Sequence, residues 1–521
     1  MRSLRLCIAL VCVVTLTSTA YSQSRSNPPA GLEDYVARVL KAFDVPGVSV
    51  SIVKDGRVAL AKGYGVRKLG ESTPVDAQTL FSIASNSKLF TATALGLLVE
   101  EGKLAWDAPV ITYLPWFQMW DPYVTRELTI RDLLVHHSGL GLGAGDLLWW
   151  PTSNLDRKEV TRRLRFIRPA TSFRSVYAYD NLLYLAAGEV IEAVSGQTWE
   201  EFVSARILRK VGMTTSTVRV SATASNQATP HAAVDGKVRP IARFDSDNTN
   251  PAGGIQSNAD DMARWMIVQL ARGKLADGSR LFSDSTWQQL TTLVTPMPID
   301  SVPPEFQGPK PDFYGYALGL IVRDYRGHKV LTHGGSLPGF VSQVVMIPDM
   351  ALGVTVLTNQ ESGAVFNAIA YHIVEHYLDA PAVDWIDVYR TLSTSQNAAA
   401  TQAVERAGLA RNTSSRPSLP LSRYVGTYTD DWYGDIVIGE QGGRLTIRFT
   451  HTPALVGDLE HWQYDTFVAR WRDRELRADA YITFALNPDG TIEQAKMAPT
   501  SPTVDFSYDF QDLLLKPKKT P

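Results

Sequence analysis

Two strand-like stretches, separated by a long segment with helical patterns, constrain the fold of this chain most strongly. Residues 47–66 alternate apolar with small or polar side chains on both sides of Asp55-Gly56, which predicts two antiparallel strands joined by a tight turn. Residues 314–359 are strand-like again, with turn residues at 324–327 and 348–349. Helical periodicity marks residues 86–101, 181–196, 259–273 and 362–378. This order predicts an α+β fold in which helices flank an antiparallel sheet.

The C-terminal part of the chain has a different pattern. Residues 412–420, with the sequence NTSSRPSLP, are typical of a linker. After them, short strands alternate with glycine and Pro-Asp-Gly turns over about 100 residues, which predicts a small all-β, barrel-like domain. We therefore divide the chain into a main domain at residues 30–385, a helical segment and linker at 386–420, and a small β-barrel-like accessory domain at 421–521.

The N-terminus has the pattern of a secretory signal peptide over residues 1–22. Arg2 and Arg5 precede an apolar run from Leu6 to Thr15, and small residues allow cleavage after Ser22. The apolar run is too short to span a bilayer, so we expect a periplasmic or secreted protein with no membrane span in the mature chain. Both cysteines of the chain lie in this segment, so the mature protein would have neither a cysteine nucleophile nor a zinc–thiolate site.

Charge argues against one class of partner. The 521 residues include 51 Lys and Arg and 53 Asp and Glu, for a formal net charge of −2, and no block of basic residues is present. A surface for nucleic acid is therefore not expected.

The pattern Ser-x-x-Lys occurs twice, and geometry distinguishes the two copies. Ser51 and Lys54 lie on a predicted strand, where residues three apart point to opposite faces. Ser85 and Lys88 lie at the start of a predicted helix, where such residues are neighbours. The Lys88 amine could there activate the Ser85 hydroxyl, which is a weak nucleophile without an adjacent base. The alternative is an ordinary helix cap at Ser85 and a solvated Lys88.

Two further segments carry candidate site residues. Tyr179-Asp180-Asn181 directly precedes a predicted helix, where a neighbouring ammonium would lower the pKa of the Tyr179 phenol and make it a general base. Without that neighbour the segment is a helix cap and a packing tyrosine.

The second segment, His333-Gly334-Gly335-Ser336, lies on a predicted strand whose glycines allow close approach of another backbone. A substrate could lie along this edge as an added strand, with the Ser85 and Ser336 N–H groups as an oxyanion hole. The alternative is a strand bulge with a surface histidine.

In combination, Ser85-x-x-Lys88, Tyr179-x-Asn181 and His333-Gly334-Gly335 resemble the motifs of the serine β-lactamase and penicillin-binding hydrolase superfamily. The chain is most similar to the branch of class C β-lactamases, D-aminopeptidases and related esterases, over roughly residues 30–380. Residues 128–140, 250–262 and 314–320 are similar to that branch as well. The resemblance implies a β-lactamase/transpeptidase-like sheet flanked by helices, a helical lobe, and an appended β-rich domain.

The same resemblance implies a role for each site residue. Ser85 would be the acylated nucleophile, Lys88 its proton partner, and Tyr179 the general base and then acid. Asn181, with residues 333–336, would bind the substrate. The function implied is that of an exported serine hydrolase that cleaves an amide, lactam or ester bond through an acyl-enzyme. The alternative is a penicillin-binding or sensor-type protein that acylates or binds a ligand with little turnover.

One departure from the family pattern leaves the substrate open. His333 stands where many of these enzymes have the lysine of Lys-Thr-Gly, which helps to bind a substrate carboxylate, and histidine is at most partly charged near neutral pH. A β-lactam, a D-amino-acid peptide and an ester therefore all remain candidates. We expect no cofactor and no metal. The one zinc-like pattern, His372-Ile-Val-Glu375-His376, lies on an apolar predicted helix and is interpreted as packing.

Overall fold

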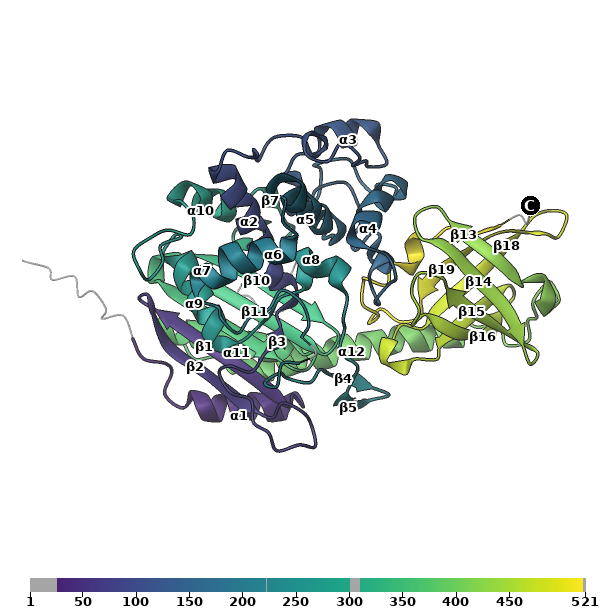
Figure 1. Cartoon of the computed structure of the whole chain (residues 1–521). Coiled ribbons are helices and arrows are strands. Elements are labelled where there is room, and N and C mark those ends of the chain that lie inside the picture. The colour runs from purple at the N-terminus through teal and green to yellow at the C-terminus, as the bar shows by residue number, and fades with distance from the viewer. Residues whose placement is uncertain (1–25, 222, 300–309, 519–521) are drawn as a thin grey trace, which may run out of the picture.

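The computed structural model describes residues 26–221, 223–299 and 310–518, so the predicted signal peptide lies outside the described residues. The chain forms a large domain of sheet and helices and a smaller domain of strands, which lies beside it in Figure 1. The long helix α12, Trp385–Leu409, runs between them and covers much of the segment interpreted as a helical linker.

The large domain is built on an eight-stranded sheet with the order β2-β1-β12-β11-β10-β9-β8-β7, in which neighbours are antiparallel. The predicted hairpin at Asp55-Gly56 joins β1 to β2, and β1 pairs with β12, so the first strands lie beside the last. The strands are β1 Gly47–Lys54, β2 Arg57–Gly65, β7 Thr295–Pro296, β8 Tyr314–Tyr316, β9 Ile321–Tyr325, β10 His328–Leu337, β11 Phe340–Ile347 and β12 Leu352–Thr358.

Helices cover both faces of this sheet. Helices α1 (Leu32–Ala42) and α11 (Gly363–Tyr377) pack on one face, where they share an apolar core with Val48, Val50 and Ile52 of β1. Helix α9 (Ala259–Leu270) packs on the other face, against β1 and β12. Since alternate residues of a strand point to opposite faces, β1 is buried along its whole length between these two layers. The predicted α+β fold is confirmed.

A helical lobe lies next to this second face. At its centre is α2, Lys88–Glu100, which is buried around its whole circumference from Lys88 to Leu98 and contacts α5, Leu182–Ser195, and α8, Asn250–Gly253. The other helices are α3 Pro122–Glu127, α4 Arg157–Arg163, α6 Trp199–Val203, α7 Arg209–Val211 and α10 Asp284–Thr291. Two small sheets pair β3 Phe81–Ser82 with β6 Gln256–Ser257, and β4 His231–Val234 with β5 Lys237–Pro240. Among the described residues, no helix is both long and apolar enough to cross a bilayer.

The C-terminal domain is a nearly closed antiparallel barrel with the strand order β19-β18-β17-β16-β15-β14-β13-β20. A bridge between Ala495 and Leu515 brings the two ends of this sheet together. The predicted small all-β domain is therefore confirmed. Its strands are β13 Gly426–Asp430, β14 Gly434–Gln441, β15 Arg444–Phe449, β16 Val456–Gln463, β17 Thr466–Trp471, β18 Ala480–Leu486, β19 Ile492–Pro499 and β20 Lys516–Pro517.

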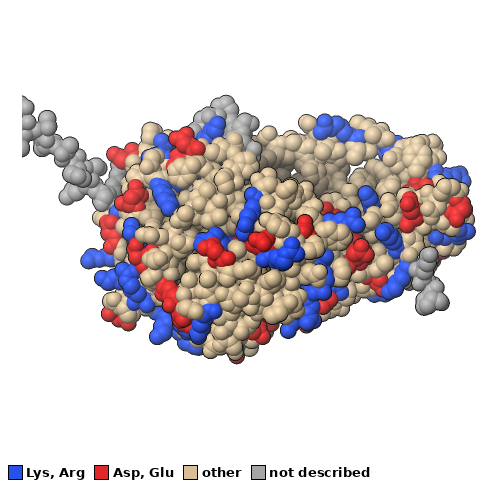
Figure 2. Space-filling model, turned by 90° about the horizontal axis from the view of Figure 1, so that it is seen from above, with Lys and Arg blue, Asp and Glu red and all other residues tan. Residues whose placement is uncertain are grey.

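The two domains share one apolar core, because a single cluster of buried side chains extends from α2 and α5 into the barrel. Polar contacts add to it, such as those from the guanidinium of Arg163, which donates to the carbonyls of Trp432 (3.0 Å) and Tyr433 (2.6 Å). Viewed from above, a recess lies where the domains meet, and acidic and basic side chains are interspersed around it (Figure 2).

Candidate active site

Ser85 and Lys88 meet at the junction of two helices. Ser85 is half-buried in a 3-10 turn, Ala84–Ser87, that leads into α2, and Lys88 begins α2 with its side chain fully buried. The Lys88 amine lies 3.1 Å from the Ser85 hydroxyl oxygen. The preceding residue, Ala84, has a φ of +48°, which is uncommon for a residue with a Cβ.

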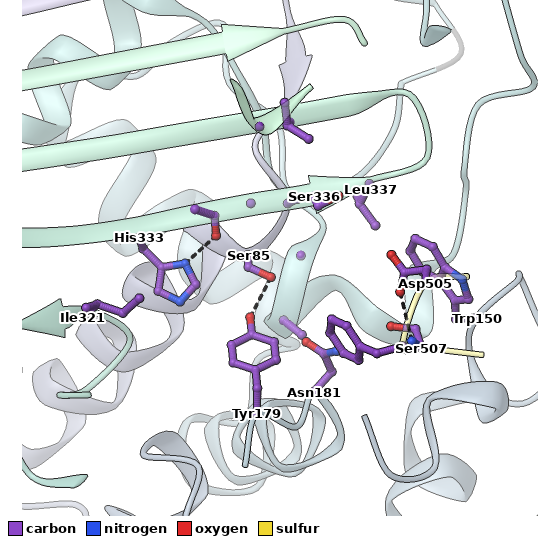
Figure 3. Close-up of a pocket in the computed structure, with 18 of the residues that line it drawn as sticks. Ser85, Trp150, Tyr179, Asn181, Ile321, His333, Ser336, Leu337, Asp505 and Ser507 are labelled. Carbon is purple, nitrogen blue, oxygen red and sulfur yellow. Dashed lines mark hydrogen bonds between the residues drawn. The ribbon is translucent and has the colours of Figure 1, made fainter. Parts of the chain in front are cut away.

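Tyr179 and Asn181 reach the same pair from the loop before α5. The Tyr179 hydroxyl donates to Oγ of Ser85 at 2.8 Å (Figure 3). Nζ of Lys88 donates to Oδ1 of Asn181 at 2.8 Å. Lys88 also donates to the Ala252 carbonyl at 3.1 Å. The structure thus brings together four residues from two distant sequence segments, with Ser85 Oγ between a phenol and an amine.

Burial changes the proton affinities of these groups. It lowers the pKa of Lys88 to about 7, and the nearby carboxyl groups of Asp146 and Asp180 partly oppose that effect. A substantial share of the amine is therefore neutral near pH 7 and able to accept a proton. The expected lowering of the Tyr179 pKa is wrong: burial raises the pKa of this phenol well above its ordinary value, so Tyr179 is protonated at neutral pH.

His333 lies on β10, and its hydrogen bonds define its protonation. Its Nδ1 is 2.6 Å from the Gly334 carbonyl, which can only accept, so Nδ1 carries the proton. The other ring nitrogen, Nε2, then accepts from the Tyr316 hydroxyl at 2.7 Å. Burial and the Lys88 charge lower the pKa of His333 to about 3. This strand position therefore has a neutral imidazole rather than a cation.

The stretch of β10 beside Ser85 is an open strand edge. Strand β9 pairs with β10 only as far as Thr332, whereas β11 on the other side pairs through Leu337. Gly335 is needed there, because a Cβ at this residue would lie 2.3 Å from the Ile83 carbonyl oxygen and 3.0 Å from the Ser85 nitrogen. The fold thus leaves residues 333–337 available for an extended ligand next to the nucleophile, as the sequence pattern predicts.

A cavity of about 560 Å³ surrounds these residues. Its walls are rich in aromatic side chains, among them Trp149, Trp150, Tyr177, Tyr314, Tyr316 and Phe366. The C-terminal domain contributes Asp505, Phe506 and Ser507, and Figure 3 places Asp505 and Ser507 on the side of Ser85 away from His333. The barrel, expected to be accessory, thus forms part of the site. No local pattern marks these three residues, because they meet Ser85 only in the folded chain.

The zinc-like pattern on α11 is used for packing. Glu375 accepts hydrogen bonds from the side chains of Tyr325, Arg326 and Trp385, and His372 stacks on the ring of Tyr35. In the part of the chain that the structure describes, no group of three or more metal-binding side chains is assembled.

Comparisons with known proteins show the family of this chain. The family model described as Beta-lactamase matches residues 32–378. This chain belongs to the Beta-lactamase family. The C-terminal part, residues 410–517, matches a domain of unknown function, DUF3471.

Relatives with similar sequences match most of the length of this chain. An unguisins hydrolase, ungD of Aspergillus violaceofuscus, is 27% identical over 88% of this chain and 86% of its own length. Protein flp of Staphylococcus aureus is 23% identical over 69% of each chain.

Solved structures show the same fold. The octameric penicillin-binding protein homologue from Pyrococcus abyssi has a TM-score of 0.57 and 22% identity, and the match covers 93% of this chain and 98% of that chain. A D-stereospecific amidohydrolase from Streptomyces has a TM-score of 0.54 and 22% identity, over 68% of this chain and 100% of that one. The predicted membership in the β-lactamase and penicillin-binding superfamily is therefore confirmed. The relatives that are named hydrolases support the interpretation of this chain as a hydrolase of that superfamily.

Proposed function

We propose that this protein is an exported serine hydrolase that cleaves an amide bond in peptide-like substrates through an acyl-enzyme on Ser85. The observation that carries the proposal is the position of Ser85 Oγ, which lies 3.1 Å from the Lys88 amine and 2.8 Å from the Tyr179 hydroxyl. A serine hydroxyl between a proton acceptor and a proton donor is the arrangement that acyl transfer requires.

The acylation step follows from the protonation of these groups. Ser85 Oγ attacks the substrate carbonyl carbon while its proton passes to neutral Lys88. The oxyanion that forms would accept from the backbone N–H groups of Ser85 and Ser336. Tyr179 then gives its proton to the leaving nitrogen as the C–N bond breaks, and Lys88 returns a proton to the phenolate. In deacylation a water attacks the ester, its proton moves through the same groups, and Ser85 is released with the free acid.

Three observations together favour a peptide-like amide over a β-lactam or a simple ester. The neutral His333 provides no charge for a substrate carboxylate at the strand position where family members use lysine. The cavity of about 560 Å³ and its aromatic walls suit a ligand larger than a simple ester. The open edge at residues 333–337 offers main-chain hydrogen bonds to an extended chain. Two similar proteins, named an unguisins hydrolase and a D-stereospecific amidohydrolase, agree with this choice.

Export is part of the proposal and rests on residues 1–22 alone. Fusion of these residues to a reporter that is active only outside the cytoplasm tests it. Reporter activity equal to that of a known exported fusion supports export, and activity that stays in the cytoplasm contradicts it.

The substrate class is tested by turnover of a matched set of compounds with the purified mature chain. The set contains D- and L-amino-acid p-nitroanilides, a p-nitrophenyl ester and nitrocefin, each assayed with Ser85→Ala as control. We expect hydrolysis of the ester and of at least one anilide, a fall of at least about 10³-fold in Ser85→Ala, and little turnover of nitrocefin. Nitrocefin as the best substrate would contradict the amide assignment. A stable adduct on Ser85 with no released product would favour the penicillin-binding or sensor-type alternative.

A further inference from the structure

A loop of the C-terminal barrel, residues 500–509, crosses into the large domain and reaches the cavity that Ser85 lines. We call it the barrel loop; it follows β19. We propose that Ser507 and Asp509 of the barrel loop are positioning residues for catalysis: they hold Asp146, and Asp146 orients Asn181 toward Lys88. The inference rests on the proposed roles of Ser85 and Lys88, and it gives the C-terminal domain a task in the reaction.

Ser507 contacts Asp146 directly. Its hydroxyl donates to Oδ2 of Asp146 at 2.9 Å, and both side chains are buried. The same carboxylate oxygen accepts from Nδ2 of Asn181 at 2.9 Å, while Oδ1 accepts from the indole of Trp149 at 2.8 Å. Three donors therefore fix the orientation of the Asp146 carboxylate, and one of them comes from the barrel.

Asp509 holds the backbone on both sides of Asp146. Its carboxylate accepts from the Gly145 N–H at 2.6 Å and from the Leu147 N–H at 3.1 Å. Gly145 has a φ of +82°, and a Cβ there would lie about 2.5 Å from Ile167, so this closely packed turn requires glycine. The fully buried Asp509 thus joins the barrel to the turn that carries Asp146.

Phe506 provides a second contact to the site. Its ring lies edge-on to the ring of Tyr179, with centroids 6.2 Å apart, and it packs against Gly143, where a Cβ would lie 2.6 Å from the Phe506 ring. The barrel loop therefore touches Tyr179 as well as the Asp146 turn.

The consequence at the nucleophile comes from the two ends of the Asn181 amide. Burial raises the pKa of Asp146 to about 7. In its ionised form the carboxylate can only accept hydrogen bonds, so ionised Asp146 requires the NH₂ end of Asn181 to face it. The carbonyl end must then face Lys88, where it accepts from Nζ at 2.8 Å. If Asp146 moved away, the amide could turn and present donor hydrogens to Lys88. These would repel the ammonium form of Lys88 and occupy the lone pair of its neutral form. The barrel loop thus keeps an acceptor, rather than a donor, beside Lys88.

The barrel loop also affects the pKa of Lys88 through charge, because Ser507 contacts Asp146, a carboxyl group whose charge raises that pKa. The groups that face Lys88 are Asp146, Asp180, Tyr179, Tyr184, His136 and His333. Burial raises the pKa of Asp146, and the hydrogen bonds from Asn181, Trp149 and Ser507 oppose that rise. Loss of the Ser507 hydrogen bond would leave Asp146 more often neutral and would remove a charge that stabilises the Lys88 ammonium. The pKa of Lys88 would then fall further.

The test uses the full mature chain and a fluorophosphonate, which labels an activated serine whatever the natural substrate is. Intact mass gives the second-order labelling rate constant as a function of pH. The variants are Ser507→Ala, which removes the donor to Asp146, and Ser507→Thr, which keeps a hydroxyl. The matched control is Ser501→Ala, a hydroxyl of the same loop that bonds only within the loop, to Thr503.

We expect labelling of Ser507→Ala to be slower by about tenfold or more, as for loss of a hydrogen bond to a charged group, with its acid limb moved to lower pH. Ser507→Thr should recover most of the rate, and Ser501→Ala should match the wild type in rate and pH profile. Melting temperatures identify any variant that has simply lost its fold.

Two results would overturn the inference. Wild-type rate and pH profile in Ser507→Ala, with Ser85 still labelled, would reject the positioning role while leaving the proposed function intact. Absence of Ser85 labelling in the wild type would reject the proposed function and this inference together. If Ser507→Ala does not fold, Asp509→Asn is used instead, and its labelling rate and pH profile are compared with those of the wild type. This variant keeps the size of the side chain but loses an acceptor. Labelling of folded Asp509→Asn at the wild-type rate would overturn the inference equally.

Discussion

The amide oxygen of Asn181 lies 2.8 Å from Nζ of Lys88, and this contact links the start of α5 to the start of α2 within the buried lobe. Lys88 is surrounded by hydrogen-bond acceptors and by two aromatic rings, with Nζ 4.8 Å from the ring centre of Tyr179 and 5.1 Å from that of Tyr184. A buried amine held this way has a defined direction, so its lone pair or proton can be aimed at Ser85.

Replacement of Asn181 tests how much the hydrogen bond between Lys88 and Asn181 contributes to activity. In Asn181→Ala the amine loses an acceptor, and we expect kcat/KM for the preferred substrate to fall by about 10- to 100-fold. Asn258→Ala is the control. Like Asn181, Asn258 is a buried asparagine at the start of a helix, where its side chain accepts from the Asp261 N–H, but it lies outside the cavity. Loss of activity in both variants to the same extent would contradict a specific role for Asn181.

The pH dependence of acylation should report the buried amine. The pKa of Lys88 is lowered to about 7, so acylation should rise as pH increases through that value and the amine loses its proton. Lys88→Met keeps an unbranched side chain but removes the acceptor, so we expect acylation to fall by about 10²-fold or more and the acid limb near pH 7 to disappear. The measurement is the acylation rate from pH 5 to pH 9. An unchanged acid limb in Lys88→Met would show that another group sets it.

Tyr179 should act as a proton donor rather than as a preformed phenolate. Tyr179→Phe retains the ring that packs on Phe506 and removes only the hydroxyl that contacts Ser85. We expect kcat for an amide to fall by about 10²- to 10⁴-fold, and less for an ester whose leaving group needs no proton. Turnover of paired p-nitroanilide and p-nitrophenyl substrates checks this difference. Equal losses on both substrates would argue against donation to the leaving group.

The adjacent glycines of β10 provide a steric test. In Gly335→Ala the new Cβ would meet backbone, namely the Ile83 carbonyl at 2.3 Å and the Ser85 nitrogen at 3.0 Å, so strand and nucleophile must move apart. We expect a large loss of activity, together with a destabilisation of about 1–3 kcal/mol from overpacking. In Gly334→Ala the Cβ would meet the end of the Gln343 side chain at 3.2 Å, which can move. Unfolding curves and kcat/KM for both variants should separate them clearly, and similar values would contradict this geometry.

The sequence predicts those parts of the molecule that depend on local patterns. The hairpin at Asp55-Gly56 and the helices after Ser85 and Asn181 follow from alternation and periodicity within short segments. The distinction between Ser51 and Ser85 follows in the same way, since Ser51 lies on β1, where Lys54 instead contacts Asp55 and Met350.

Features that depend on distant segments could not be predicted this way. Ser507 and Asp146 are 361 positions apart, and no spacing rule connects them. The rise in the pKa of Tyr179 could not be predicted from the sequence either, because it depends on burial that only the folded lobe creates. Asp146 itself follows a glycine-rich stretch, residues 139–145, and such a stretch indicates a loop and gives no sign of a buried carboxylate.

The most direct test of the account is the site of covalent acylation. The chain without residues 1–22 is mixed with a slowly hydrolysed p-nitrophenyl ester, quenched in acid and analysed by intact mass and peptide mapping. We expect one acyl group per chain, located on the peptide that contains Ser85, and none in Ser85→Ala. An acyl group on another residue, or ester turnover that is unchanged in Ser85→Ala, would contradict it.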